Sequence, residues 1–339
     1  MPKVMSPTVS ILINNYNYGR FLRQAIDSAL AQTYLRTEVI VVDDGSTDES
    51  RNIIQSYGDR IRAVLKANGG QGSAFNAGFA AATGSIIFFL DSDDYYSPTG
   101  VERTVSIWNK ETRILHHRLR SVDANRNEIG YKPGKLVILD AGDVVPLMLR
   151  DGDYSGPPTS GLVYSREVLE KILPMTEDQF RICADSYLHL AAPFFGHVTV
   201  TNEILAYYRI HGSNAYAAPA RRFWIRKTLR KITHNTDVCV ALLQKLTKER
   251  GLPVPSPFAW QDAERLFQKL LLSRADSSPN NLVNLLIFNV LKKLWTTPQK
   301  SWTYRFRVAL LSFFVYLAPR FLLGRVYRNI FMETKQEEN

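Results

Sequence analysis

The chain has 339 residues, of which 45% are hydrophobic and 22% are charged, so it can bury a full core and is not a disordered or fibrous protein. Two cysteines, Cys183 and Cys239, are too few for a disulfide framework or a cysteine zinc site, and a reducing cytosol is the default compartment.

The formal charge of +10 is unevenly distributed along the chain. Residues 1–218 carry 21 Lys and Arg against 24 Asp and Glu, a net −3, whereas residues 219–339 carry 21 against 8, a net +13. The basic C-terminal part predicts contact with an anionic surface, either lipid or nucleic acid. No basic segment followed by an apolar run opens the chain, which predicts no secretory signal.

Three apolar runs in the first hundred residues predict buried strands, and each ends in polar residues. The runs are residues 9–13, 39–42 and 86–90. The segments between them have helical spacing and cover residues 21–32, 50–57 and 74–82. Strands that alternate with helices predict an α/β fold with parallel strand pairs. Ligands bind beyond the carboxyl ends of such strands, so the polar residues are expected to meet at one edge.

The third run ends in Asp91-Ser92-Asp93-Asp94, three carboxylates within four positions. Isolated ionised carboxylates are costly to desolvate, so a cluster at a strand end calls for a cation. Oxygen ligands at short spacing suit Mg²⁺ or Mn²⁺, which also bind substrate phosphates. The alternative is an acidic turn that caps a helix beginning near Ser97-Pro98.

The middle of the chain carries weaker signals. Residues 122–129 are typical of a turn between short strands. Residues 140–149 predict a helix with Asp140 as its N-cap. Residues 154–161 form a loop rich in Gly and Pro, either the wall of an acceptor pocket or an ordinary surface turn.

Residues 220–339 show helical spacing of apolar residues among Lys and Arg. Helices are predicted over residues 224–231, 238–250, 259–272 and 282–294, with a hinge at 251–257. An apolar segment, residues 308–323, is interrupted by Pro319-Arg320 and is too short for a bilayer span. Its flanking arginines and aromatics fit an interfacial helix, and the alternative is a terminal helix packed on the domain.

The ordered set of motifs resembles family 2 glycosyltransferases of the GT-A fold. The resemblance is dense over the first hundred residues and continues thinly to Tyr208-Arg209-Ile210-His211. Its main motifs are Glu38-Val39-Ile40-Val41-Val42-Asp43-Asp44-Gly45-Ser46, Asn76-Ala77-Gly78, Ala82-Thr83-Gly84 and Asp91-Ser92-Asp93-Asp94. It implies a GT-A Rossmann-like, mostly parallel sheet flanked by helices and followed by a C-terminal all-helical region. The expected domains are residues 1–218, with nucleotide-sugar binding over 1–100 and the acceptor side over 101–218, and a basic helical region over 219–339.

The resemblance also implies roles for individual residues. Asp93 would be the direct metal ligand, and Asp91 would contact ribose or a metal-bound water. Asp44 would accept the uracil imide hydrogen, and Tyr16 would pack against the ring. Further nucleotide contacts are expected from Asn14, Lys66 and Asn68.

On the acceptor side, Asp185 stands where the family has its general base, although Ala184 replaces the usual Glu. The alternative for Asp185 is a buried or helix-capping aspartate. His211 would complete the metal shell or contact phosphate, unless it is structural. Phe75 replaces an arginine of the family pattern that could help to hold the diphosphate.

These features predict an inverting, metal-dependent glycosyltransferase that transfers sugar from a UDP-linked donor during polysaccharide, glycolipid or other cell-surface glycan assembly. It would attach to the cytoplasmic face of the cell membrane and bind no nucleic acid. It would add one sugar per encounter, because the chain lacks Gln-x-x-Arg-Trp, the signature of processive relatives. The alternatives are an inactive GT-A-like module that binds lipid through its basic tail, and a nucleotidyltransferase.

Overall fold

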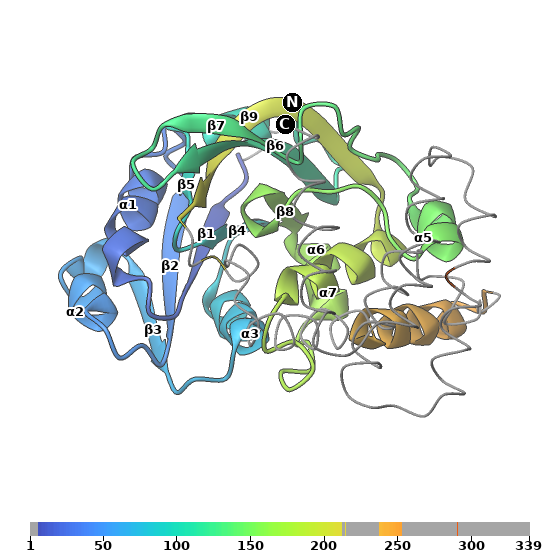
Figure 1. Ribbon diagram of the computed structural model, residues 1–339, viewed down its shortest axis with the longest axis horizontal. Coiled ribbons are helices and arrows are strands. Elements are labelled where there is room, and N and C mark those ends of the chain that lie inside the picture. Colours follow the sequence, from blue (N-terminus) through green and yellow to red (C-terminus); the bar gives the residue numbers. More distant parts are fainter. Residues whose placement is uncertain (1–5, 212–213, 215–236, 253–289, 291–339) are drawn as a thin grey trace, which may run out of the picture. The chain divides into compact units, whose positions relative to one another are not determined.

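A computed structural model describes residues 6–211, 214, 237–252 and 290 (Figure 1). The chain divides into two compact units. The first comprises Met1–Pro146 and Tyr154–His211, and the second comprises Leu147–Asp153 and Gly212–Asn339. The predicted domain division after residue 218 stays a prediction.

Four parallel strands form one half of the sheet in the order β3-β2-β1-β4. They are β1 (Val9–Asn15), β2 (Thr37–Asp44), β3 (Arg62–Lys66) and β4 (Ile86–Asp91). The connecting helices are α1 (Gly19–Leu30), α2 (Ser50–Gln55) and α3 (Gln71–Ala81), with a 3₁₀ turn, η1, at Gly58–Arg60. The alternation predicted from the sequence is confirmed.

Both faces of this half are covered, which explains why its strands are apolar runs rather than alternating ones. Odd-numbered residues of β1, such as Ile11, pack in one core with residues of α1 such as Leu22. Even-numbered residues face α3, where a side chain at Gly78 would meet Leu12 and Val42. Successive side chains of a strand point to opposite faces, so one apolar run serves both layers.

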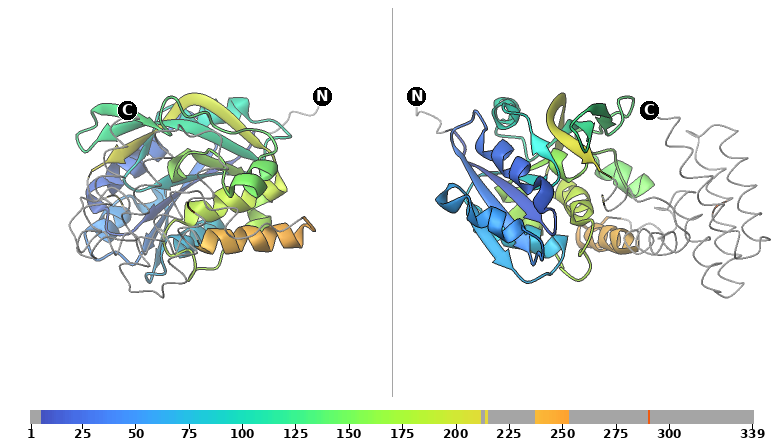
Figure 2. Two further views of the ribbon diagram at one scale, coloured as in Figure 1. Left: turned by 45° about the vertical axis from the view of Figure 1, so that its right-hand side comes forward. Right: turned by 60° about the vertical axis from the view of Figure 1, so that its left-hand side comes forward.

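The second half of the sheet is mixed. β8 (Leu162–Ser165) runs antiparallel to β4 and to β6 (Ile114–Asp123), whereas β9 (Val198–Ile210) is parallel to β6 and antiparallel to β5 (Tyr95–Tyr96). β7 (Glu128–Lys132) pairs with β6, and these outer strands curl over the sheet (Figures 1 and 2). The other elements are α4 (Gly100–Ile107), α5 (Val145–Asp151), η2 (Thr159–Gly161), α6 (Arg166–Ile172), α7 (Ala184–Ala191) and η3 (Ala192–Phe195).

The weaker sequence signals had mixed outcomes. The turn over residues 122–129 is confirmed, since it joins β6 to β7. Asp140 does not cap a helix, because α5 begins only at Val145 and the Asp140 carboxylate accepts a hydrogen bond from the Ser155 amide (2.7 Å).

Of the helices predicted in the C-terminal part, the one over 238–250 corresponds to helical residues 237–249. The other three, and the apolar segment 308–323, lie outside the described residues. No helix among the described residues is both long and apolar enough to cross a bilayer.

Candidate active site

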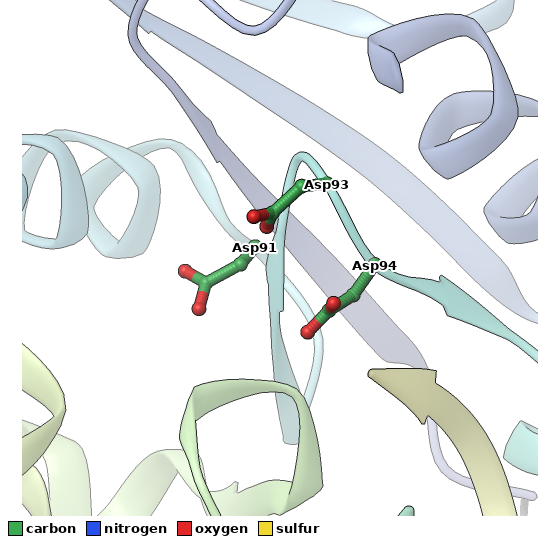
Figure 3. Close-up of side chains that lie close together, drawn as sticks. All are labelled: Asp91, Asp93 and Asp94. Carbon is green, nitrogen blue, oxygen red and sulfur yellow. The ribbon is translucent and has the colours of Figure 1, made fainter. Parts of the chain in front are cut away.

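Three carboxylates gather at the turn after β4, where Asp91 ends the strand and Asp93 and Asp94 follow (Figure 3). Each offers an oxygen, and these oxygens lie within 4.8 Å of one another. Burial and mutual repulsion raise the pKa of Asp91 to about 7 and the pKa of Asp94 well above its ordinary value. A divalent cation would remove this repulsion, and an all-carboxylate donor set fits Mg²⁺ or Mn²⁺.

The three carboxylates differ in burial and in the hydrogen bonds that they accept from the protein. Asp94 is buried and accepts hydrogen bonds from the Ser160 hydroxyl (2.6 Å) and the Arg209 amide (2.8 Å). Asp91 lies at the end of its strand and accepts from the Asn14 side-chain amide (2.9 Å). Asp94 therefore shapes the turn, while Asp91 and Asp93 are the residues that could hold a cation.

His211 contacts Asp93, which fits the expected role near a metal. Its second ring nitrogen contacts Arg20, and this contact determines which nitrogen carries the hydrogen. The His211 Nε2 lies 2.9 Å from an Asp93 carboxylate oxygen, and its Nδ1 lies 3.0 Å from an Arg20 guanidinium nitrogen. Arginine only donates, so Nδ1 accepts and Nε2 carries the hydrogen that Asp93 receives. In this arrangement His211 orients Asp93, and its role as a metal ligand stays a prediction.

The predicted nucleotide residues converge on the carboxyl end of β2. The Asp44 carboxylate accepts from Lys66 Nζ (2.7 Å) and from the amides of Gly69 (2.9 Å) and Gly70 (2.7 Å). Asn68 donates to the Asp44 carbonyl (2.9 Å). Asp44, which is 3% exposed, thus fixes the loop after β3, and its oxygen bonded to Gly70 has one further lone pair.

Tyr16 and Phe75 differ sharply in exposure. Tyr16 is 48% exposed, so its ring is free to pack against a base, whereas Phe75 is buried against Phe89 with ring centres 4.6 Å apart. Phe75 is therefore a core residue. An arginine reaches this region from elsewhere in the chain, because Arg181 donates to the Asn68 side-chain oxygen (2.8 Å).

Asp185 lies in the first turn of α7 and near the carboxylate cluster. Desolvation raises its pKa, and its negative charge contributes to the raised pKa of Asp91. The Thr159 hydroxyl donates to Asp185 (3.3 Å) and also lies beside Asp91, whose pKa it lowers. Gln71 connects the same two regions, since it donates to Asp91 (3.4 Å) and accepts from the Ala184 amide (2.9 Å).

The loop over residues 154–161 is packed against the protein rather than being an ordinary surface turn. The Tyr154 ring is buried and stacks on His189, with centres 3.9 Å apart. A side chain at Gly156 would collide with the His189 ring. The loop ends in η2, which places the Thr159 and Ser160 hydroxyls on the carboxylates of the site.

Comparisons with known proteins agree with this geometry. The family model "Glycosyl transferase family 2" matches residues 10–173. An uncharacterized glycosyltransferase of Nostoc sp. is 42% identical over 219 residues, which cover 62% of this chain and 67% of that protein. The chain belongs to glycosyl transferase family 2.

A further curated relative matches over a shorter region. The chondroitin synthase of Pasteurella multocida is 46% identical over 111 residues, which cover 32% of this chain and 12% of that protein. In structure the chain is similar to S. aureus TarS, with a TM-score of 0.51, 14% sequence identity, and coverage of 95% of this chain and 55% of that one. That likeness supports the GT-A fold.

In this family 2 glycosyltransferase, sequence analysis missed the residues that hold the predicted ones in place. Arg209 is 2% exposed, and its guanidinium donates to the Asp93 carbonyl (2.8 Å) and to Gln24. Thr159 and Ser160 lie in the Gly- and Pro-rich loop over residues 154–161, and no sequence pattern distinguishes them from the rest of it. The one sequence signal for Arg209 is its place two residues before His211 in Tyr208-Arg209-Ile210-His211, and that place does not show its role.

Proposed function

We propose that this glycosyltransferase transfers a sugar from a UDP-linked donor to an acceptor hydroxyl in a single displacement that inverts the anomeric centre. The observation that carries the proposal is the proximity of a three-carboxylate cluster to a fourth carboxylate on another element. Asp91, Asp93 and Asp94 gather at the end of β4, and Asp185 lies near them through Thr159. We infer that the cluster after β4 binds the cation and the diphosphate, and that Asp185 takes the proton of the acceptor hydroxyl.

The nucleotide would bind along the ends of β1 and β2. Tyr16 offers an exposed ring for the base, and Asp44 keeps acceptor capacity for its imide hydrogen. Asn14, Lys66 and Asn68 border the same edge through their bonds to Asp91 and Asp44. Arg181 is a candidate to supply the positive charge that Phe75 lacks.

In the reaction, the acceptor oxygen forms a bond to the anomeric carbon while the bond from that carbon to the diphosphate breaks. Asp185 accepts the proton of the acceptor hydroxyl, and the nucleoside diphosphate leaves with the electron pair. A Mn²⁺ or Mg²⁺ ion held by Asp91 and Asp93 would stabilise the charge on the leaving diphosphate. The raised pKa of Asp185 makes it a stronger base than an ordinary aspartate.

We also propose that the enzyme works in cell-surface glycan assembly at the cytoplasmic face of the membrane. One relative is named a chondroitin synthase, which supports a glycan product. The net charge of +13 on residues 219–339 supports attachment to an anionic surface that carries a lipid-linked acceptor.

The test is nucleotide release from a panel of nucleotide sugars with Mn²⁺ or Mg²⁺. Asp93→Asn should abolish release, and Asp185→Asn should lower turnover ~10²–10⁴-fold while nucleotide binding persists. Asp59→Asn, at an exposed site in η1, is the matched control and should behave as wild type. Product analysis by NMR would show the anomeric configuration. Full turnover by either active-site variant, or by wild type in excess chelator, would refute the corresponding role.

A further inference from the structure

The segment that follows β7 presents aliphatic side chains to solvent. Leu136 is 94% exposed and Ile138 is 83% exposed, with Val137 between them at 43%. Single exposed apolar residues are ordinary on protein surfaces, but a run of three, two of them almost fully exposed, makes this segment a candidate contact surface. We name residues 133–138 the apolar loop.

The apolar loop is held in shape from beneath by a buried arginine. Arg118, on β6, is 7% exposed. Its guanidinium donates to the carbonyls of Pro133 (2.9 Å), Gly134 (2.7 Å) and Val137 (2.8 Å). The Val137 amide donates to the Gly134 carbonyl (2.9 Å), which closes a turn. The exposure of the aliphatic side chains is therefore fixed by the fold.

This construction suits insertion into an apolar medium. A backbone carbonyl that leaves water without a partner costs free energy, so a loop entering a bilayer must satisfy its carbonyls internally. Arg118 supplies partners for three of them. Lys132 and Lys135 flank the aliphatic tip, and residues 129–139 contain no Asp or Glu. The charge at the tip therefore complements anionic lipid headgroups.

A protein partner fits these observations less well. A stable protein–protein interface buries about 800 Å² on each side, far more than three aliphatic side chains provide. Interfacial attachment to lipid has no such minimum area, because its strength scales with the apolar area buried plus the attraction of basic residues to anionic lipids.

We propose that the apolar loop is a membrane-contact element. Leu136 and Ile138 enter the boundary between headgroups and acyl chains of an anionic bilayer, and Lys132 and Lys135 contact its phosphates. The inference rests on the membrane location in the proposed function, yet it assigns the contact to the first unit of the chain rather than to the basic C-terminal region.

The test is flotation of the full-length protein with vesicles rich in phosphatidylglycerol and with pure phosphatidylcholine vesicles. The double variant L136S/I138S should lower partitioning about tenfold, a loss expected for partial burial of two aliphatic side chains. L35S is the matched control, because Leu35 is 93% exposed in the turn between α1 and β2 and should have no effect. K132Q/K135Q should weaken binding to the anionic vesicles alone, and only at low salt.

Equal partitioning of L136S/I138S, L35S and wild type would overturn the proposal. So would a full-length dimer that L136S/I138S converts to a monomer without a change in vesicle binding, because the loop would then join two copies. Thermal unfolding of each variant checks that the fold is intact. Nucleotide release should be unchanged in L136S/I138S, so failure of the lipid proposal would leave the roles of Asp93 and Asp185 untouched.

Discussion

Replacing Arg209 with Met should destabilise the protein strongly, because this side chain ties β9 to three other parts of the first unit. Its guanidinium donates to the Asp93 carbonyl (2.8 Å), to the Ala124 carbonyl (3.3 Å) and to the Gln24 side chain. It also lies 4.7 Å from the centre of the Phe21 ring. Methionine keeps the length and the apolar packing of the stem but removes every donor.

The expected loss can be built from these contacts. Two well-formed hydrogen bonds from a buried charged donor contribute about 1.5–3 kcal/mol each, and the cation–π contact adds about 0.5–2 kcal/mol. Some water will reach the unpaired acceptors, so we expect a loss of about 3–5 kcal/mol in the free energy of unfolding. A domain has about 5–15 kcal/mol in total, so the variant should fold but with a small margin.

Guanidinium-induced unfolding followed by circular dichroism measures this loss. Arg103→Met is the control, because Arg103 makes a two-bond ion pair with Glu203 (2.8 Å) at an exposed site and should matter little. Mn²⁺ affinity should also fall in Arg209→Met, since the Asp93 backbone loses its anchor. If the two variants unfold at the same denaturant concentration, Arg209 does not support the site as described.

Three further predictions follow from the site and its surroundings. Mn²⁺ affinity should weaken about tenfold per pH unit below pH ~7, because protons compete with the cation for Asp91, whose pKa is raised to about 7; calorimetry showing constant affinity from about pH 6 to 8 would contradict this. Burial lowers the pKa of His117 to about 4, so as pH falls below about 6.5 the unfolded state binds this proton before the folded state does. The free energy of unfolding should therefore fall by about 1.4 kcal/mol per pH unit until about pH 4. His117→Asn should lack that share of the drop in unfolding experiments at about pH 7.5 and 5. Thr159→Val should lower kcat with an unchanged KM for the donor, and Thr159→Ser should restore it; equal losses in both would assign the effect to packing.

The sequence revealed the strands and the carboxylates because those signals are local. An apolar run that ends in Asp91-Ser92-Asp93-Asp94 carries its own evidence within ten residues. The parallel order of β1, β2 and β4 then places Asn14 beside Asp91, as the registers show. The helix prediction at Asp140 is wrong because the Asp140 carboxylate accepts a hydrogen bond from the Ser155 amide instead of capping a helix. Ser155 is fifteen positions away, and no local pattern shows this partner.

The supporting residues could not be found in the same way, because their partners are remote in sequence. Ser160 meets Asp94 across 66 positions, and Arg209 meets Asp93 across 116. A serine in a Gly- and Pro-rich loop and an arginine in a strand look like surface residues until the fold brings acceptors to them. Burial of a polar group requires such partners, so the polar residues least expected in the core are the ones that fix its geometry.

Arg118 and Arg209 show one physical device used for two purposes. Each is a buried arginine whose donors satisfy backbone carbonyls of a loop: the apolar loop for Arg118, and the turn of Asp93 for Arg209. A loop held in this way loses little further conformational entropy when it binds, because its backbone is already ordered. The same chemistry orders both loops, the one that we propose binds a cation and its diphosphate and the one that we propose enters lipid. The two can be separated experimentally, since L136S/I138S should change only vesicle binding and Asp93→Asn only nucleotide release.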